Sequence, residues 1–308
     1  MKTIKNYKRR LSSKQTLGII LIAPSIIIFL IFIAFPTVQS FAISFFKWDG
    51  SHPWEFVGLK NYINMFTRDP YFFTSLKNSI IYSLVYTLGV NIMGFTIAVI
   101  LDLKVRFWKI YRFIFFLPVT LSIMAMGLLW SKVFERYGLL NSILNTIGIN
   151  VGEYAWLGNR RVAFLIIMFV SIWQFFGYPM VFYLAGLSNI NPEIYEAAEI
   201  DGASLIRKIF AISIPMLKNI ISIVVVLNLI ISFKVFDIVW IMTMGGPAGV
   251  TEVLGTQLYK KAFVEQSFGR GSVIAVIMFI VCMILALIFV KFSGYSEPVF
   301  KKERFLKK

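Results

Sequence analysis

The stretch Glu196-Ala197-Ala198-Glu199-Ile200-Asp201-Gly202-Ala203 is a short polar segment between long apolar runs. Just before it, Asn191-Pro192-Glu193 has the pattern of a helix start, because Asn caps free amides, Pro suits the first helical position and Glu complements the positive helix end. Glu and Ala then favour a helix, and Gly202 can adopt the left-handed conformation that ends one. The sequence therefore predicts a rigid, capped helix outside the apolar phase.

This predicted helix has the features of a docking element. Glu193, Glu196 and Glu199 recur at helical spacing and share a broad acidic face. We expect this face to fit a basic or amide-rich groove of another protein. The alternative is a helix that lies on the membrane surface, but an anionic surface repels an acidic helix. Ser204 begins a second predicted helix, and Pro215 marks the entry to the next apolar run.

The composition indicates whether the rest of the chain folds in water or in a membrane. Of the 308 residues, 58% are hydrophobic, whereas soluble domains average about 45–50%. Such an excess indicates a membrane protein. The formal net charge is +16, but most charges flank apolar runs, which fits a topology signal better than nucleic-acid binding. The single cysteine, Cys282, and the single histidine, His52, exclude an internal disulfide and a Cys/His zinc cluster.

Six apolar stretches approach the roughly 20 residues that a helix needs to cross a bilayer. They are continuous rather than alternating, so we expect helices and not barrel strands. The predicted spans are Leu17–Val38, Ser79–Leu101, Phe113–Val133, Val162–Leu187, Ile220–Ile241 and Ser272–Phe292. The predicted fold class is all-α, with a basic N-terminal tail at 1–16, a six-helix membrane domain at 17–292 that contains the polar loop 190–215, and a basic C-terminal tail at 293–308.

Lysine and arginine indicate the orientation in the membrane. They concentrate in both tails, in the loop after the second span and in the loop that holds Glu196. Because cytoplasmic segments carry the excess of positive charge, we expect a multi-pass membrane protein with both termini and the Glu196 loop in the cytoplasm. Arg160 and Arg161 lie on the other side and weaken this trend locally.

Polar side chains inside the spans are costly in lipid and therefore predict a path for a polar solute. The candidates are Asn91, Trp173, Gln174, Tyr178, Asn228 and Ser232. Amides, hydroxyls and aromatic rings suit a sugar, which offers hydroxyl groups and apolar ring faces. Gln174 and Asn228 are the preferred pair. Hydrogen bonding between helices, worth about 0.6–2 kcal/mol per contact, is the open alternative for each residue.

Two features lie near the outer end of the fifth span. Lys234 and Asp237 are three residues apart, so we expect a structural ion pair on one helix face, with a proton relay as the alternative. Beyond them, Gly245-Gly246-Pro247 predicts a turn in the external loop.

The sequence has no phosphate-binding loop of its own. Gly89 and Gly94 have the glycine spacing of such a loop, but Phe95 stands where the lysine belongs. Gly94 and Ala98 form a small-xxx-small pair instead, which favours close contact between helices. Any ATP-driven motor must therefore be another chain.

The order of residues from Glu196 to Pro215 resembles the cytoplasmic coupling motif of permeases in binding-protein-dependent ABC importers. The matching residues are Glu196, Ala197, Ala198, Asp201, Gly202, Ala203, Ile212 and Pro215. Other segments resemble the carbohydrate branch of that family: Phe56 to Tyr62, Arg112 to Pro118, Phe236-Asp237 and Thr243 to Pro247. The resemblance covers nearly the whole chain, in order.

The resemblance implies a type I ABC importer permease fold with a coupling helix, similar to maltose-type sugar permeases, in the inner (cytoplasmic) membrane of a bacterial cell. It further implies a heterodimer with a second, homologous permease, two ATPase subunits that bind ATP and Mg, and a sugar-binding protein outside the membrane. This chain itself would hold no cofactor, metal or catalytic residue. The coupling residues would be Glu193, Glu196, Ala197, Ala198, Asp201, Gly202, Ala203 and Pro215. The external loop 242–270, with Gly245, Gly246 and Pro247, would face the binding protein and the outer gate.

The predicted function is therefore that of a permease subunit of a bacterial ATP-driven sugar importer, and not of an enzyme. One alternative is an ABC permease for another solute, such as a sugar phosphate. It calls for cationic residues facing the path, and only Lys234 lies well inside a span. Another is a stand-alone secondary transporter or channel, which leaves the segment from Glu196 to Gly202 unexplained. A membrane enzyme lacks any His, Cys or paired-carboxylate constellation in the spans.

Overall fold

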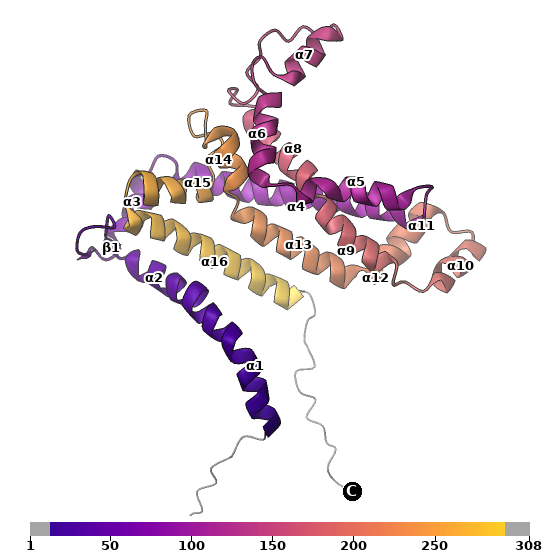
Figure 1. Cartoon of the computed structure of the whole chain (residues 1–308), viewed down its shortest axis with the longest axis horizontal. Coiled ribbons are helices and arrows are strands. Elements are labelled where there is room, and N and C mark those ends of the chain that lie inside the picture. Colours follow the sequence, from indigo (N-terminus) through magenta and orange to yellow (C-terminus); the bar gives the residue numbers. More distant parts are fainter. Residues whose placement is uncertain (1–12, 293–308) are drawn as a thin grey trace, which may run out of the picture.

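The computed structural model describes residues 13–292, and long apolar helices dominate this part of the chain (Figure 1). The predicted N-terminal tail 1–16 lies largely outside the described residues, and the predicted C-terminal tail 293–308 lies wholly outside them. The apolar helical segments are α1 (Ser13–Phe29), the π-helical η1 (Leu30–Ala34), α2 (Phe35–Ile43), α4 (Phe72–Asp102), α5 (Trp108–Thr120), α6 (Ile123–Val133), α8 (Ala163–Phe175), α9 (Gly177–Leu187), α13 (Lys218–Phe233) and α16 (Phe268–Phe292).

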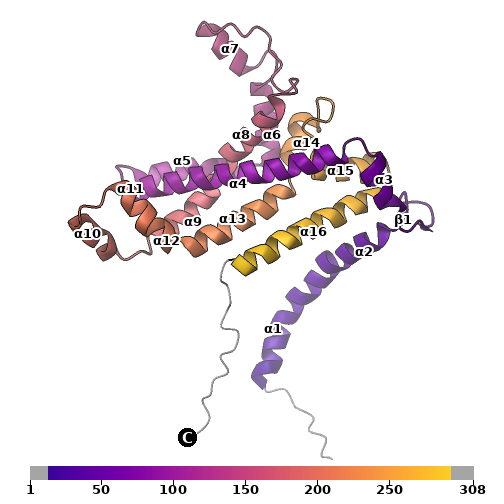
Figure 2. The ribbon, with the colours of Figure 1, turned by 180° about the vertical axis from the view of Figure 1, so that it is seen from behind.

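Shorter elements connect these helices. They are β1 (Phe46–Lys47), β2 (Glu55–Phe56), α3 (Lys60–Arg68), α7 (Leu139–Thr146), α10 (Pro192–Ile200), α11 (Leu205–Lys208), the π-helical η2 (Ile209–Ser213), α12 (Ile214–Met216), α14 (Asp237–Thr243), α15 (Leu254–Tyr259) and the π-helical η3 (Lys260–Val264). The two strands pair antiparallel, with Phe46 opposite Phe56. Elements α3 and β1 lie at one end of the molecule, and α10 and α11 lie at the other (Figures 1 and 2).

The number of spans depends on how bent helices are counted. Three continuous helices are long and apolar enough to cross a membrane: Ile20–Ile43, Phe72–Asp102 and Phe268–Phe289. Three further spans arise only if pairs of helices joined at a bend each count as one. The all-α membrane fold is thus confirmed, but the third, fourth and fifth predicted spans are not straight helices. Apolar composition alone does not distinguish a straight span from a bent one.

The third span, predicted as Phe113–Val133, turns by 94° between α5 and α6. Pro118 lies inside α5, and Leu121 after it adopts an extended conformation with ψ 147°. A proline inside a helix removes one hydrogen bond and favours such a break. Helix α6 therefore leaves the direction of α5 and leads towards α7, which projects from the bundle (Figure 1).

The fifth span, predicted as Ile220–Ile241, is interrupted near its C-terminal end. Helix α13 ends at Phe233 and α14 begins at Asp237, so Lys234 and Asp237 do not lie three residues apart on one helix. Within the described residues they form no ion pair, and the predicted Lys234–Asp237 pair is wrong. At its inner end α13 meets the preceding helix, Leu205–Met216, at 75°. The fourth span bends by 40° between α8 and α9.

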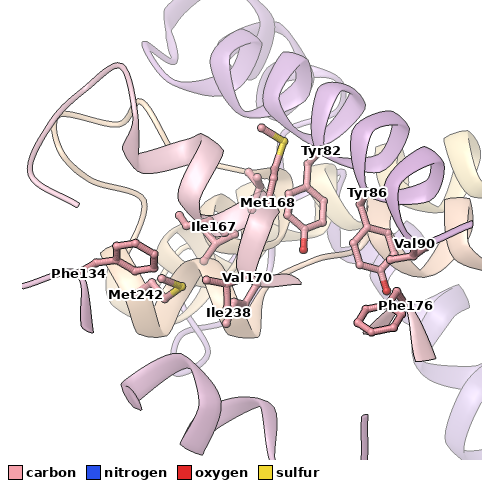
Figure 3. Packing of buried hydrophobic residues seen from close by; sticks show 12 residues of the cluster. Tyr82, Tyr86, Val90, Phe134, Ile167, Met168, Val170, Phe176, Ile238 and Met242 are labelled. Carbon is pink, nitrogen blue, oxygen red and sulfur yellow. The ribbon is translucent and has the colours of Figure 1, made fainter. Parts of the chain in front are cut away.

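The core lies where α4 packs against α8, α9 and α13. Figure 3 shows its buried cluster, in which Tyr82, Tyr86 and Val90 of α4 face Ile167 and neighbouring residues of α8. The predicted small-residue contact is present at the crossing with α9. A Cβ atom on Gly94 would lie 2.9 Å from both the amide nitrogen of Met180 and the carbonyl oxygen of Phe176. Ala98, one turn further along, is fully buried.

Helix α1 diverges from this bundle (Figures 1 and 2). Large apolar side chains along it and along η1, such as Leu21 and Phe32, are about 70% exposed. Helix α2 returns to the bundle and packs on α16, where the rings of Phe41 and Phe279 are 5.5 Å apart. Apolar area of this size needs lipid or another apolar partner to cover it.

Candidate coupling loop and solute cavity

The loop that holds Glu196 has the local structure that its sequence predicts. Asn191 caps α10, because its side-chain oxygen accepts a hydrogen bond from the Glu193 amide at 3.2 Å. The helix ends at Ile200, and Gly202 adopts a left-handed conformation with φ +73°. Ser204 caps α11 by accepting from the Arg207 amide at 3.3 Å. The helix, glycine turn and second helix are thus confirmed as structure.

Helix α10 stands at the end of the molecule opposite α3 and contributes no buried residue (Figure 1). Its three glutamates differ. Glu199 pairs with Lys208 at 2.6 Å, and Glu193 accepts a hydrogen bond from Asn191 at 3.0 Å. Glu196 is exposed and forms no ion pair with any residue in the range 13–292. The acidic face is therefore only partly compensated inside this chain.

Two side-chain contacts tie α10 to the helices that enter the fifth span. The hydroxyl groups of Tyr195 and Ser213 lie 2.9 Å apart, and the ring of Tyr195 packs on the buried cluster that includes Leu187 and Leu217. Ser213 ends η2, directly before the bend at Leu217. A displacement of α10 would therefore act on Ser213 and Leu217, which lie just before the N-terminal end of α13.

A cavity of about 520 Å³ lies among α4, α8, α9 and α13 and reaches the break before α14. Tyr178, Asn228 and Ser232, three of the predicted path residues, line it. The side-chain nitrogen of Asn228 is buried and has no hydrogen-bond partner among the described residues. We refer to this space as the solute cavity. It presents both hydrogen-bonding groups and aromatic rings.

Tyr82 and Tyr86 also line the solute cavity, although the sequence analysis did not select them. Their rings stack with centroids 5.8 Å apart on one face of α4. Two tyrosines spaced by four residues inside an apolar span are the signal that was available in the sequence. Lys234 and Asp237 line the same cavity beside the break before α14, and neither forms an ion pair among the described residues.

The other three predicted path residues lie elsewhere. The side chain of Asn91 donates to the Thr87 carbonyl oxygen at 2.7 Å and accepts from the Tyr183 hydroxyl. Gln174 is 1% exposed and donates to the Leu121 carbonyl oxygen at 3.3 Å, at the break between α5 and α6. Trp173 packs edge-on against Trp130. The preferred pair, Gln174 and Asn228, is therefore not brought together in one cavity.

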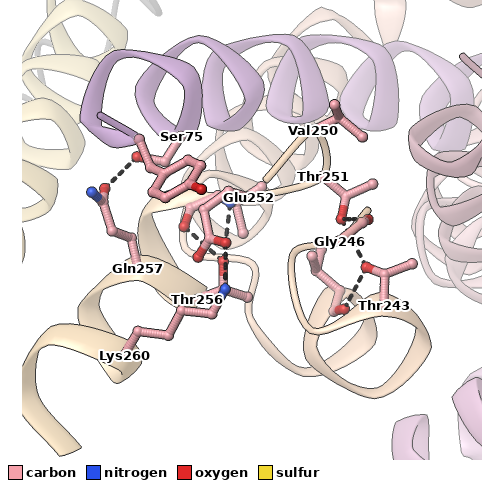
Figure 4. Close-up of polar contacts among 12 residues, drawn as sticks. Ser75, Thr243, Gly246, Val250, Thr251, Glu252, Thr256, Gln257 and Lys260 are labelled. Atoms are coloured by element: carbon pink, nitrogen blue, oxygen red, sulfur yellow. Dashed lines mark hydrogen bonds and ion pairs between the residues drawn. The ribbon is translucent and has the colours of Figure 1, made fainter. Parts of the chain in front are cut away.

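The external loop forms the turn predicted at Gly245-Gly246-Pro247. Gly245 has φ +84°, and a Cβ atom there would collide with the Glu252 carboxylate. The Thr251 hydroxyl donates to the Gly246 carbonyl oxygen at 2.7 Å, and Glu252 pairs with Lys260 at 2.6 Å (Figure 4).

Side chains of α4 hold this loop in place. Asn78 donates to the carbonyl oxygens of Val250 and Glu252 at 2.9 and 2.8 Å, and the hydroxyl of Ser75 bonds to Gln257 (Figure 4). The outer loop is therefore fixed to the second span rather than loosely attached.

The bent helices, the capped loop α10 and the cavity between the spans define a membrane permease. The model of the family "Binding-protein-dependent transport system inner membrane component" matches residues 90–294, and the chain belongs to this family. The predicted family resemblance is thus confirmed. The chain is a membrane-embedded permease subunit of an ABC importer, and its relatives are transport components.

Several relatives match along most of their length. The probable ABC transporter permease YurN of Bacillus subtilis is 37% identical and aligns over 88% of this chain and 94% of that protein. The multiple sugar-binding transport system permease MsmF of Streptococcus mutans is 33% identical over 90% of this chain and 94% of its own length. The sulfoquinovosyl glycerol transport system permease SmoG of Agrobacterium fabrum is 31% identical over 90% of each.

The fold also matches a solved structure. A chain of a bacterial alginate ABC transporter, in complex with a pentasaccharide-bound periplasmic protein, superposes with a TM-score of 0.81. The alignment covers 91% of this chain and 95% of that chain, at 22% identity.

Proposed function

We propose that this chain is one permease of a bacterial, ATP-driven importer of a sugar or oligosaccharide and forms half of the translocation path. The observation that carries the proposal is the solute cavity, where the stacked Tyr82 and Tyr86 lie near the unpartnered amide of Asn228. Aromatic faces and hydrogen-bonding groups together suit a carbohydrate. The names of the relatives MsmF and SmoG support the same class of cargo.

The solute contacts that we propose are Tyr178, Asn228 and Ser232, together with Tyr82 and Tyr86. Asn91 and Trp173 make structural contacts between helices instead. The external turn at Gly245-Gly246-Pro247 would belong to the outer gate and the surface that meets the binding protein.

Helix α10 would be the element that couples transport to ATP hydrolysis. Its exposed residues, among them Glu196, would insert into a cleft of an ATPase that binds ATP and Mg. The coupling residues are Glu193, Glu196, Ala197, Ala198, Asp201, Gly202, Ala203 and Pro215. The assembly would contain a second, homologous permease as heterodimer partner, two ATPases and a substrate-binding protein, with both termini and α10 in the cytoplasm. Support comes from the capped geometry of α10 and its place at one end of the bundle.

The test uses the complex of both permeases and both ATPases in lipid nanodiscs with its binding protein. ATP hydrolysis is measured across a panel of neutral and acidic mono- and oligosaccharides. We expect at least one saccharide to stimulate hydrolysis, and E196K to abolish the stimulation while E153K, a change of an exposed glutamate before α8, leaves it intact. Equal stimulation in both variants would refute the coupling role. A complex that no saccharide stimulates would refute the sugar assignment.

An anionic saccharide is the second candidate cargo. Lys234 lines the solute cavity and forms no ion pair within the described part of the chain, and a free cation in such a place favours a carboxylate or sulfonate. We expect K234Q to weaken stimulation by acidic saccharides and not by neutral ones, if the cargo is anionic. If K234Q weakens stimulation by acidic and by neutral saccharides equally, Lys234 has no role in selecting the charge of the cargo.

A further inference from the structure

A second large cavity, of about 510 Å³, lies between α3, the β1–β2 strands and the beginning of α16. Elements α3 and β1 lie at the end of the molecule opposite α10 (Figures 1 and 2). Its lining includes the cations Lys47, Lys60, Arg68, Lys261 and Arg270 and the carboxylates of Glu55 and Asp69. We call it the outer basic cavity. It is separate from the solute cavity, with which it shares no lining residue.

Most of these charges are neutralised within the chain, but two are not. The ion pairs are Lys261–Asp69 at 2.8 Å, Lys261–Glu265 at 2.9 Å, Arg270–Glu265 at 3.5 Å and Lys47–Glu55 at 3.7 Å. Burial lowers the pKa of Lys261, but the hydrogen bonds to Asp69 and Glu265 outweigh this effect and raise it. Lys60 and Arg68 form no ion pair with any of residues 13–292. They carry the excess charge of the cavity.

Lys60 and Arg68 belong to one row on α3. Together with Asn64 they follow an i, i+4, i+8 spacing and line the cavity, so two turns separate the cations by about 12 Å along the axis. Leu59, Ile63 and Phe66 are also exposed and form a separate apolar face. The basic row is therefore distinct from the apolar face of the same helix.

The membrane topology does not account for this charge. Lysine and arginine are enriched in cytoplasmic loops and not in outer ones, yet the cavity lies at the end of the bundle away from α10. Two unpaired cations on the outer side favour an acidic partner in the surrounding water. Their separation is wider than one acidic sugar ring spans, which favours a protein surface over an acidic monosaccharide; the experiment below separates a protein surface from an acidic oligosaccharide.

We propose that the outer basic cavity docks an acidic surface of the substrate-binding protein, with Lys60 and Arg68 each meeting a carboxylate and the two carboxylates about 12 Å apart. The proposal rests on the proposed function, since it names the contact between this chain and its binding protein. Rim charges of this kind act mainly on the rate of association and on its dependence on salt.

The experiment titrates the binding protein against the nanodisc complex and measures the concentration that gives half-maximal stimulation of ATP hydrolysis. The variants are K60E, R68E and the double variant K60E/R68E. The control is R160E, which reverses an exposed arginine before α8 and outside the cavity. Each titration is repeated at about 50 mM and about 300 mM salt, because screening weakens exposed charge pairs.

We expect the double variant to need at least about tenfold more binding protein at low salt, with unchanged basal hydrolysis and unchanged maximal rate. The half-maximal concentration of binding protein should change less between low and high salt for the double variant than for the wild type. A half-maximal concentration equal to that of R160E would overturn the docking proposal while leaving the proposed function intact. Direct loss of uronate-oligosaccharide binding, without the binding protein, would make the cavity a ligand site instead. If no binding protein stimulates ATP hydrolysis by the wild-type complex, both the docking proposal and the proposed function are wrong.

Discussion

The hydroxyl oxygens of Tyr195 and Ser213 lie 2.9 Å apart and join the exposed helix α10 to the last residue of η2. Helix α10 buries no residue of its own, so this bond and the Glu199–Lys208 pair at 2.6 Å carry much of its attachment. The bond meets the chain just before the 75° bend into α13. The proposed link between an ATPase and the solute cavity is therefore short.

Removing this bond should reduce coupling without unfolding the protein. A hydrogen bond of this kind contributes about 1 kcal/mol, and Y195F keeps the ring that packs on Leu187 and Leu217. We expect Y195F and S213A each to lower the number of solutes imported per ATP, and the double variant to be no worse than either. Solute uptake and ATP hydrolysis are both measured in proteoliposomes, and their quotient gives the number of solutes imported per ATP. Y137F removes an exposed hydroxyl that bonds Glu153 and serves as control.

The glycine turn should also be required for its backbone conformation alone. Gly202 has φ +73°, and no atom lies within 4 Å of the position that a Cβ would take. G202A therefore adds backbone strain of about 1 kcal/mol without a collision. We expect lower stimulation of ATP hydrolysis, with a change in melting temperature no larger than that of the control G152A. G152A makes the same change at φ +55° in the loop between α7 and α8, where a Cβ also meets no atom within 4 Å. A similar loss of stimulation in G152A would contradict the coupling role of the Gly202 turn.

The crossing of α4 and α9 should tolerate no larger residue. A Cβ on Gly94 would lie 2.9 Å from two backbone atoms of α9 and its preceding residue. Because backbone cannot move aside as a side chain can, we expect G94A to cost about 1–3 kcal/mol. A lower melting temperature of the purified complex in detergent tests this. G18A, where the added methyl group meets nothing within 4 Å, should melt as the wild type does.

Two asparagines inside the membrane should respond in opposite ways. Asn91 accepts a hydrogen bond from Tyr183, so N91L leaves that hydroxyl without a partner and should destabilise the complex by about 1–3 kcal/mol. Asn228 has an unpartnered nitrogen in the solute cavity, so N228L should leave the melting temperature unchanged and raise the KM for uptake. The same loss of stability in both variants would remove Asn228 from the proposed path.

The sequence predicted features set by local chemistry. Asn191, Gly202 and Ser204 act as caps and turn in the structure because their backbone preferences are independent of the rest of the fold. Gly94 was likewise recognised as a contact residue from its spacing to Ala98 alone.

Features set by distant contacts were not predictable. Gln174 and Asn228 have the same chemistry in the same kind of span, and only the packing of α8 against the broken α5–α6 pair separates their environments. Lys234 and Asp237 appeared paired because three residues along a helix bring two side chains together. The chain leaves the helix at Lys234, and hydropathy carries no signal for that break.

The absence of buried side chains on α10 has a consequence for how such importers diversify. Apart from the contact of Tyr195, its residues meet few packing constraints from the helices beside it. Changes on this helix can therefore accumulate at little cost in folding stability. If α10 meets the ATPase as proposed, a permease of this design can be matched to a different ATPase by altering one short loop, and several permeases can share a single motor if they present the same surface there.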